Sequence, residues 1–316
     1  IYNACEINPV IYSKSGKTIL HEAYENKNEE LLFYLLDLGA SPNFADNEGE
    51  SVIFKTFMNR DDKIAEIIQD DYNGEINNRN KDGDSLGHIA ILQNDIKWLE
   101  YLLKRKLYIE SRDKKSQTLF MYSITAQNNL QISQLLLNYG ANINVYENDG
   151  NTSFNYVCSE KKFNSDKFYF LLKNRCNIDI ANKNRELPIS NLIKFDRKEE
   201  ALVLINKNAL FVDCESSAEP IVIALLKHSK FWFEKLVEEG ANAMNKTFPV
   251  IEKYLDEPFF DFEILKKMKF FNITIGNPIQ TALSNNKKEV AVFLWENASQ
   301  DDRNLISKSF DCNLLK

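Results

Sequence analysis

Residues 16–23 read GKTILHEA, and a close variant, GDSLGHIA, stands at residues 83–90. A second stretch, LLDLGASPN at residues 35–43, returns at residues 136–144 as LLNYGANIN. Because the paired stretches recur at a regular interval, the chain is predicted to be a stack of one small supersecondary unit. Each unit needs its neighbours to cover its apolar sides, so we expect one elongated array instead of two ordinary domains.

The unit restarts every 32 to 35 residues along most of the chain. The turn residues that occupy the place of Gly16 in successive copies are Gly16, Gly49, Gly83, Ser116, Gly150, Arg185 and Ser217. Two looser copies follow, near Pro249 and Pro278, after shorter steps. The pattern therefore predicts about nine units, of which the last two are degenerate.

Each copy carries signals for two short helices and a turn. Apolar residues at helical spacing, such as Leu31, Leu32, Leu35 and Leu36, predict the second helix. The Asn- and Gly-rich stretch that follows it indicates an extended turn or hairpin. The residues expected to cap first helices are Thr18, Ser51, Ser85, Thr118 and Thr152. First-turn prolines are expected at Pro188, Pro220 and Pro278, and second-helix ends at Gly39, Gly140 and Gly240.

These stretches resemble the ankyrin repeat, whose pattern is Gly-x-Thr-Pro-Leu-His-x-Ala, a helix ending in Leu-Leu, and Gly-Ala-Asp-x-Asn. The resemblance extends over residues 13–299. It implies an all-α ankyrin-repeat solenoid of about nine helix-turn-helix units with short hairpin-like fingers. Residues 1–12 are expected to form a partial repeat or cap, and residues 300–316 a C-terminal capping helix. The family histidine survives as His21 and His88, which we expect to bond neighbouring backbone.

Composition narrows the classes of function. The net charge of −7 and pI near 5.3 argue against nucleic acid as a partner. Five widely separated cysteines suggest neither a disulfide framework nor a zinc site, which favours the cytoplasm or the nucleus. No apolar run reaches the roughly 18 to 20 residues that a membrane-spanning helix needs. Because the chain starts at Ile1 instead of a methionine, the reading that it is a portion of a longer protein stays open.

Catalysis, a cofactor and a metal ion are not expected. The chain has three histidines, and none stands in a pattern with a Ser or Cys nucleophile. His228, at the end of a first helix, is expected to face solvent. Residues 16–18 (GKT) resemble the end of a phosphate-binding loop, but position 11 is Ile11 where that motif needs glycine. A turn of the repeat explains this stretch better.

The resemblance implies that a protein partner binds the concave face, which first helices and fingers form. Two positions one helical turn apart are expected to be exposed there, and several copies place apolar or aromatic residues at them. The predicted partner-binding residues are Lys55, Met58, Ile89, Leu92, Tyr122, Thr125 and Tyr156. The alternative is that these large side chains fill gaps between irregular repeats. A weaker patch holds Ile223 and Leu226, and Asp46, Glu48, Glu147 and Asp149 are either partner-facing acids or hydrated turn residues.

The function expected from these features is a non-catalytic protein-interaction scaffold. Two alternatives stay open. In the first, the array is a segment of a channel, a transferase or a pathogen effector whose activity lies elsewhere. In the second, it is a structural subunit of a large assembly, which would require large apolar side chains on the convex face as well.

Overall fold

The computed structural model describes residues 13–126, 129–209, 219–241, 250–268 and 276–298, together with Arg303. The chain divides into two units, residues 1–148 and residues 149–316, and each is described by itself. The predicted cap at residues 1–12 lies outside the described residues, as does the capping helix predicted for residues 300–316, apart from Arg303.

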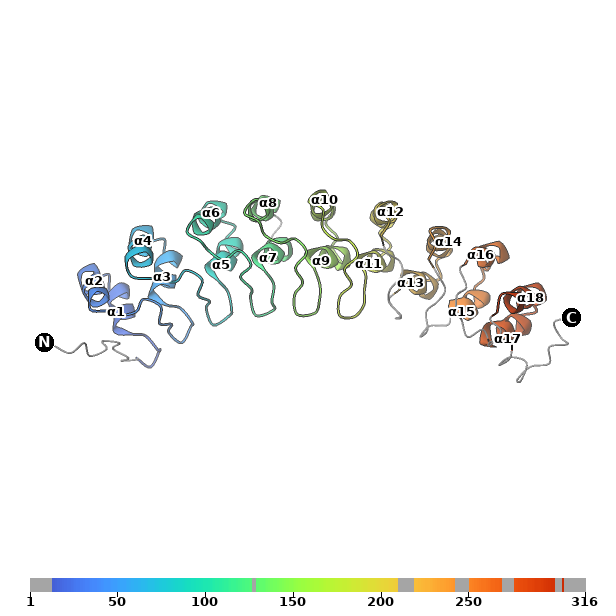
Figure 1. Ribbon diagram of the computed structural model, residues 1–316, viewed down its shortest axis with the longest axis horizontal. Helices are drawn as coiled ribbons and strands as arrows, with labels where there is room; N and C mark the ends of the chain where they lie inside the picture. Colours follow the sequence, from blue (N-terminus) through green and yellow to red (C-terminus); the bar gives the residue numbers. More distant parts are fainter. Residues whose placement is uncertain are drawn as a thin grey trace. The chain divides into compact units, whose positions relative to one another are not determined.

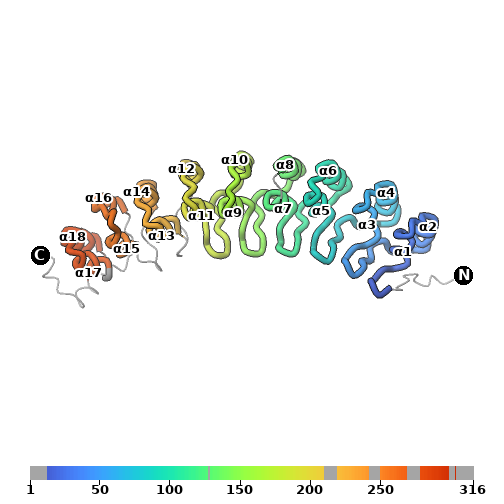
Figure 2. Tube along the Cα trace, turned by 180° about the vertical axis from the view of Figure 1, so that it is seen from behind, coloured from blue at the N-terminus to red at the C-terminus, as the bar shows by residue number. Residues whose placement is uncertain are grey.

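The first unit contains four helix pairs in two rows. The even-numbered helices form an outer row, and the odd-numbered helices lie next to the fingers (Figures 1 and 2). Consecutive odd-numbered helices contact one another, as do the two members of each pair. The helices are α1 (Ile19–Glu25), α2 (Glu29–Asp37), α3 (Val52–Met58), α4 (Asp62–Asp71), α5 (Leu86–Leu92), α6 (Ile96–Lys104), α7 (Leu119–Thr125) and α8 (Leu130–Asn138).

The second unit repeats this arrangement with five further pairs. Its helices are α9 (Ser153–Ser159), α10 (Ser165–Lys173), α11 (Pro188–Lys194), α12 (Lys198–Asn206), α13 (Pro220–Leu226), α14 (Lys230–Glu238), α15 (Val250–Asp256), α16 (Phe262–Lys267), α17 (Gly276–Ser284) and α18 (Lys288–Glu296). The described residues thus hold nine helix pairs, which confirms the predicted number of units and the all-α class. The boundaries of the array at residues 13 and 299 stay a prediction.

The helix ends follow the sequence signals. All five predicted capping residues directly precede an odd-numbered helix. The Ser51 hydroxyl, for example, accepts the Phe54 N–H at 3.3 Å, which satisfies one of the free amides at the start of α3. Pro188 and Pro220 are the first residues of α11 and α13. Gly39, Gly140 and Gly240 follow second helices with φ of +91°, the left-handed conformation that glycine adopts at low cost.

The fingers are tight turns held by one acceptor side chain each. Asp46 Oδ1 accepts the N–H groups of Glu48 and Glu50 at 2.9 and 3.0 Å. Asn80, Asp113 and Asn182 make the same pair of bonds in later fingers. In the first unit, three isolated antiparallel bridges confirm the hairpin-like geometry: Ala45 with Ser51, Arg79 with Ser85, and Arg112 with Thr118.

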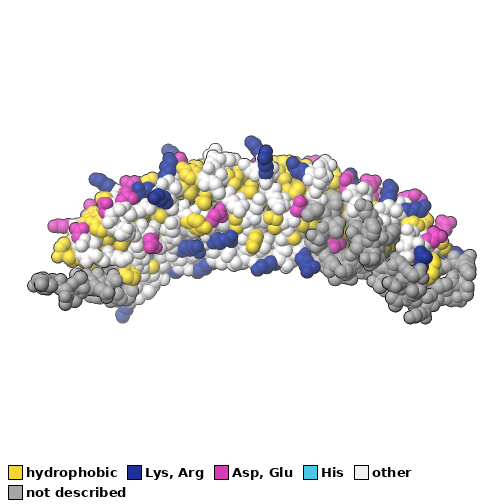
Figure 3. Space-filling model, viewed as in Figure 1, with side chains coloured by type: hydrophobic (Ala, Val, Ile, Leu, Met, Phe, Trp, Pro, Cys, Tyr) yellow, Lys and Arg dark blue, Asp and Glu magenta, His cyan; other side chains and the backbone are white. Residues whose placement is uncertain are grey.

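Two of the acidic finger residues are placed differently from either expectation. Asp46 and Glu147 are buried, so they are neither hydrated turn residues nor partner-facing acids. Lysines stand beside the exposed acids: Lys81 pairs with Glu48, and Lys114 Nζ lies 3.7 Å from Asp82. On the face shown in Figure 3, dark blue Lys and Arg side chains gather along the lower edge, where the fingers lie. The fingers are therefore not an acidic surface.

Polar side chains at the family histidine position link neighbouring repeats. In the first unit, His21 Nε2 lies 3.0 Å from the Glu50 carbonyl and His88 Nε2 lies 3.3 Å from the Gln117 carbonyl, which confirms the predicted roles. In the second unit, Asn155 replaces the histidine and donates to the Ile180 carbonyl at 2.9 Å. His228 was predicted to face solvent; its side chain is 75% exposed and bonds to the Glu257 carboxylate.

Candidate functional site

Six of the seven predicted partner-binding residues lie in the first unit. Lys55 and Met58 are on α3, Ile89 and Leu92 on α5, and Tyr122 and Thr125 on α7. These three helices contact one another in sequence order. We call the surface formed by these six residues the first-helix face. The seventh residue, Tyr156, is partly buried on α9 in the second unit.

Leu92 is the most exposed large apolar side chain of the first-helix face. It is 58% exposed, and Ile89, one turn earlier on the same helix, is partly exposed. A side chain this open does not fill a gap between repeats. Solvent contact at an aliphatic residue is unfavourable by about 25 cal/mol per Å² of apolar surface, so covering this position would stabilise a complex.

Tyr122 combines packing with exposure. Its ring contacts the ring of His88 edge-on, with centroids 5.3 Å apart and an interplanar angle of 76°. Gap filling between repeats thus accounts for part of this side chain. Burial, with smaller contributions from the Asp84 and Asp113 carboxylates, raises the pKa of the Tyr122 hydroxyl. The hydroxyl therefore stays protonated at neutral pH and can donate a hydrogen bond to a partner.

Thr125 has a hydroxyl that is already committed to its own helix. Its Oγ1 donates to the Met121 carbonyl at 3.1 Å, one turn back. The side chain is partly exposed beside Tyr122 on α7. It can therefore contribute its methyl group and an acceptor lone pair at the edge of the first-helix face.

Lys55 is held by three carboxylates. Its Nζ lies 3.0 Å from Asp46, 3.1 Å from Glu50 and 3.6 Å from Glu25, and the side chain is only 15% exposed. Burial lowers the pKa of Lys55, but the hydrogen bonds to Asp46 and Glu50 outweigh this effect and raise the pKa overall. The ammonium group thus ties α3 to its own finger and to α1, and it is not available as a separate charge for a partner.

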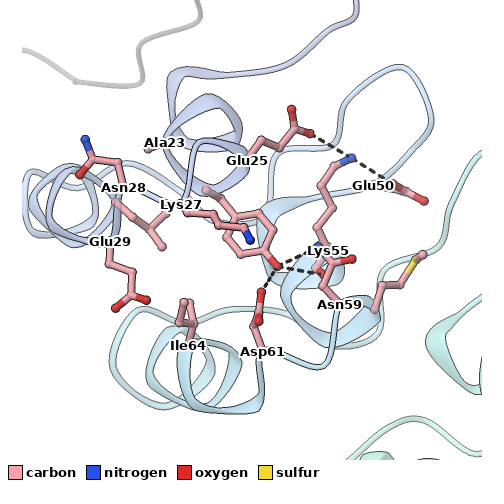
Figure 4. Close-up of a pocket in the computed structure, with 13 residues that line it drawn as sticks. Ala23, Glu25, Lys27, Asn28, Glu29, Glu50, Lys55, Asn59, Asp61 and Ile64 are labelled. Carbon is pink, nitrogen blue, oxygen red and sulfur yellow. Dashed lines mark hydrogen bonds and ion pairs between the residues drawn. The ribbon is translucent and has the colours of Figure 1, made fainter.

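Lys55 and Met58 also line a cleft of about 400 Å³ between the first two repeats (Figure 4). On its floor, the Tyr24 hydroxyl donates to the Asp61 carboxylate and accepts from Asn59 Nδ2 at 2.9 Å. Burial, followed by the bond to Asp61, raises the pKa of Tyr24. The cleft is lined by more carboxylates than ammonium groups, but its polar atoms are largely paired with one another.

Tyr24 and Asp61, on the floor of this cleft, are not identified as a polar pair by the sequence analysis. The sequence does contain a signal for this polar pair. Phe57, Ile91 and Ile124 occupy the place of Tyr24 in the next three repeats, so a hydroxyl at this place needs a polar partner nearby. Asp61, in the turn of the following repeat, is that partner.

A known family model matches the part of the chain that contains the first helix pairs. The family model described as ankyrin repeats (3 copies) matches residues 20–113, 44–147 and 87–184. The chain belongs to the ankyrin-repeat family. Three curated proteins, each aligned over part of the chain, are similar to it at 27% to 30% identity.

The first relative is the nuclear factor NF-kappa-B p105 subunit of Gallus gallus, 27% identical over 139 residues, which are 43% of this chain and 14% of the relative. The second is the NF-kappa-B inhibitor zeta of Bos taurus, 30% identical over 129 residues, 40% of this chain and 17% of the relative. The third is a putative ankyrin repeat protein of Rickettsia felis, 28% identical over 102 residues, 32% of this chain and 33% of the relative. The chain therefore spans between 14% and 33% of the length of these relatives.

A solved structure is also similar: the crystal structure of the ankyrin repeat domain of Bcl-3, a member of the IkappaB protein family. It is 22% identical, with a TM-score of 0.47, and the match covers 57% of this chain and 80% of that chain.

Two kinds of feature are absent from the described residues of this ankyrin-repeat chain. No helix in the described ranges is both long enough and apolar enough to cross a membrane. The same part of the chain holds no group of three or more His, Cys, Asp or Glu side chains arranged to bind a metal ion.

Proposed function

We propose that this ankyrin-repeat protein is a non-catalytic interaction scaffold that binds a protein partner through the first-helix face. The observation that carries the proposal is the exposure of Leu92, at 58%, beside the partly exposed Ile89 and Tyr122 on contacting helices. Aliphatic and aromatic side chains surrounded by polar ones are the composition of a protein-binding hot spot.

The backbone under this surface supports the proposal, since it is held in place before any partner arrives. The Ser85 N–H donates to His88 Nδ1 and the Met121 N–H donates to Thr118 Oγ1, and these bonds fix the starts of α5 and α7. The His88 bond to the Gln117 carbonyl joins the two repeats. A preordered surface loses less conformational entropy on binding than a flexible one, so a small apolar centre is sufficient for useful affinity.

We further propose that the protein acts in the cytoplasm or the nucleus. Cys158 and Cys176 are free thiols, which is the ordinary state of cysteine in reducing compartments. Burial raises the pKa of the Cys158 thiol well above its usual range, so this cysteine is an inert core residue instead of a nucleophile.

The test is quantitative affinity purification with the parent and with the double variant Leu92→Ala/Tyr122→Ala. The matched control is Tyr139→Ala, which removes a 39% exposed aromatic residue at the end of the outer helix α8. We expect the parent and the control to recover one protein in equal amounts and the double variant to recover at least about tenfold less, because hot-spot truncations cost about 2 kcal/mol or more each. Equal recovery by all three folded proteins would refute the proposal.

A further inference from the structure

A second groove lies in the second unit, between α11 and α13, and has a volume of about 320 Å³. Its floor is polar, with Ser190 and Asn191 from α11. One wall is apolar and comes from α13, with Ile223 and Leu226. None of these residues belongs to the first-helix face.

The floor of the groove has unused hydrogen-bonding capacity. Ser190 is fully buried, and its Oγ has no hydrogen-bond partner. Asn191, beside it on α11, is 3% exposed and lines the same groove. Buried polar groups are normally paired, and leaving one unpaired costs about 1–3 kcal/mol. The unpaired Ser190 hydroxyl and the neighbouring Asn191 amide both line one groove, and we take this polar floor as the place where a ligand completes the site.

The origin of the groove is visible in the repeat pattern. Ser190 occupies the place of His21, His88 and Asn155, each of which reaches a carbonyl beyond its own helix pair. A serine side chain is too short to do so. Position 190 therefore lacks the bridge that His21, His88 and Asn155 make, and Ser190 lines the groove beside Asn191 instead.

The chemistry of Asn191 selects for a peptide group. An asparagine side chain presents one carbonyl acceptor and two N–H donors in a plane, which complements the N–H and C=O of a peptide bond. On the wall beside it, Leu226 is 58% exposed and Ile223 is 9% exposed, so the surface next to the amide suits an aliphatic side chain.

The rim of the groove is basic. Lys227 Nζ donates to the Lys194 carbonyl at 2.7 Å, and Lys194 Nζ lies 3.5 Å from Glu186. Glu186 also accepts from Asn182 at 3.0 Å. The groove is thus lined by two ammonium groups and one carboxylate, and this excess of positive charge favours an acidic group on the ligand.

We propose that this groove binds an extended segment of a partner protein in which an aliphatic residue is followed by an acidic one. The aliphatic side chain packs on Ile223 and Leu226, and its peptide group pairs with Asn191. The acidic side chain lies by Lys194 and Lys227. Three features of the groove, the Asn191 amide, the apolar wall and the excess of positive charge, each select one part of this segment.

The test uses three synthetic probes and the whole chain. The probes are acetylated, amidated peptides with the central pairs Leu-Asp, Leu-Lys and Ser-Asp in a Gly-Ser background. Binding is followed by NMR titration of the isotope-labelled protein, with the side-chain NH₂ signals of Asn191 as the local reporter. We expect the Leu-Asp peptide to shift these signals and to bind at least about tenfold more tightly than either other peptide, the equivalent of about 1.4 kcal/mol.

Variants of the groove then separate binding from folding. Asn191→Leu keeps the volume of the side chain and removes its hydrogen bonds, and Lys227→Gln removes one charge of the rim. Each is expected to weaken binding of the Leu-Asp peptide by about tenfold or more, while Lys173→Gln, at an exposed position of α10, leaves it unchanged. No binding of the Leu-Asp peptide at millimolar concentration, equal binding of all three peptides, or full binding by a folded Asn191→Leu protein would each overturn the proposal. None of these results bears on the first-helix face.

Discussion

Replacing His88 tests how neighbouring repeats are joined. Its Nδ1 accepts the Ser85 N–H at 3.2 Å and lies 2.9 Å from the Ser85 hydroxyl. Because Nδ1 is an acceptor, Nε2 carries the proton and donates to the Gln117 carbonyl. The residue is 1% exposed, so water cannot take over these bonds without local opening.

The expected cost of His88→Ala follows from these contacts. The Gln117 carbonyl keeps a second bond from the Asp113 N–H at 3.1 Å, so its loss is limited to one net hydrogen bond of about 1 kcal/mol. The Ser85 N–H loses its acceptor and is left buried, at about 1–3 kcal/mol. With the cavity left by the ring, we expect a total of about 3–5 kcal/mol.

His88→Asn is the matched control, since Asn155 shows that an amide can make all three bonds. Its Oδ1 accepts from the Thr152 N–H at 3.0 Å and from the Thr152 hydroxyl, and its Nδ2 reaches a carbonyl. We expect His88→Asn to cost less than about 1.5 kcal/mol. The assay is urea unfolding followed by far-ultraviolet circular dichroism. If the alanine variant lies within about 0.5 kcal/mol of the parent, or if both variants lose equal stability, the reasoning is refuted.

Three further predictions concern stability. Burial lowers the pKa of His21 and His88, so the unfolded chain binds more protons than the folded chain in acid. The free energy of unfolding should therefore fall as the pH drops below 6.5, the ordinary pKa of histidine, and it should fall less steeply in His88→Asn. A urea midpoint that does not change between about pH 7.5 and 5.5 would contradict this prediction. Leu102→Ala removes a fully buried side chain of α6 and should cost about 2–5 kcal/mol in calorimetry or urea unfolding, so an unchanged melting curve would exclude a core role. Asp46→Ala should cost about 1–3 kcal/mol, because it removes the bonds to the finger N–H groups and the ion pair with Lys55. Asp46→Asn should retain the finger, because Asn80 makes the same bonds in the next one. Equal melting temperatures of the two variants would contradict the role of Asp46 as the acceptor that holds the finger.

The sequence predicted the repeat units, their caps and their histidine bonds because these features depend on residues close in the chain or at one fixed offset. It did not predict which side chains meet across repeats. The ion pairs of Lys55 and the Tyr24–Asp61 bond depend on side-chain reach between units, which spacing alone does not specify. Of the groove in the second unit, the sequence indicated the apolar wall of Ile223 and Leu226 but not the polar floor of Ser190 and Asn191, because the floor depends on how α11 and α13 pack.

The spacing that includes Leu31 correctly predicts α2, but it does not specify which of its apolar residues are buried. Leu31 is 36% exposed, Tyr34 on the same helix is 60% exposed, and Leu38, which follows the helix, is 41% exposed. In the third repeat, the outer helix uses the same side to reach back to the preceding repeat, where Tyr101 donates to Glu66. No repeat precedes α2 within the described residues, so these side chains meet solvent.

The central claim, that the first-helix face binds a protein partner, is tested most directly by site-specific photo-crosslinking. A photoreactive phenylalanine analogue replaces Leu92 on α5 in one protein and Leu38, at the end of the outer helix α2, in another. Both positions are exposed, at 58% and 41%. The account predicts a partner crosslinked strongly from position 92 and weakly from position 38. Equal crosslinking from both positions, or crosslinking from position 38 alone, would contradict it.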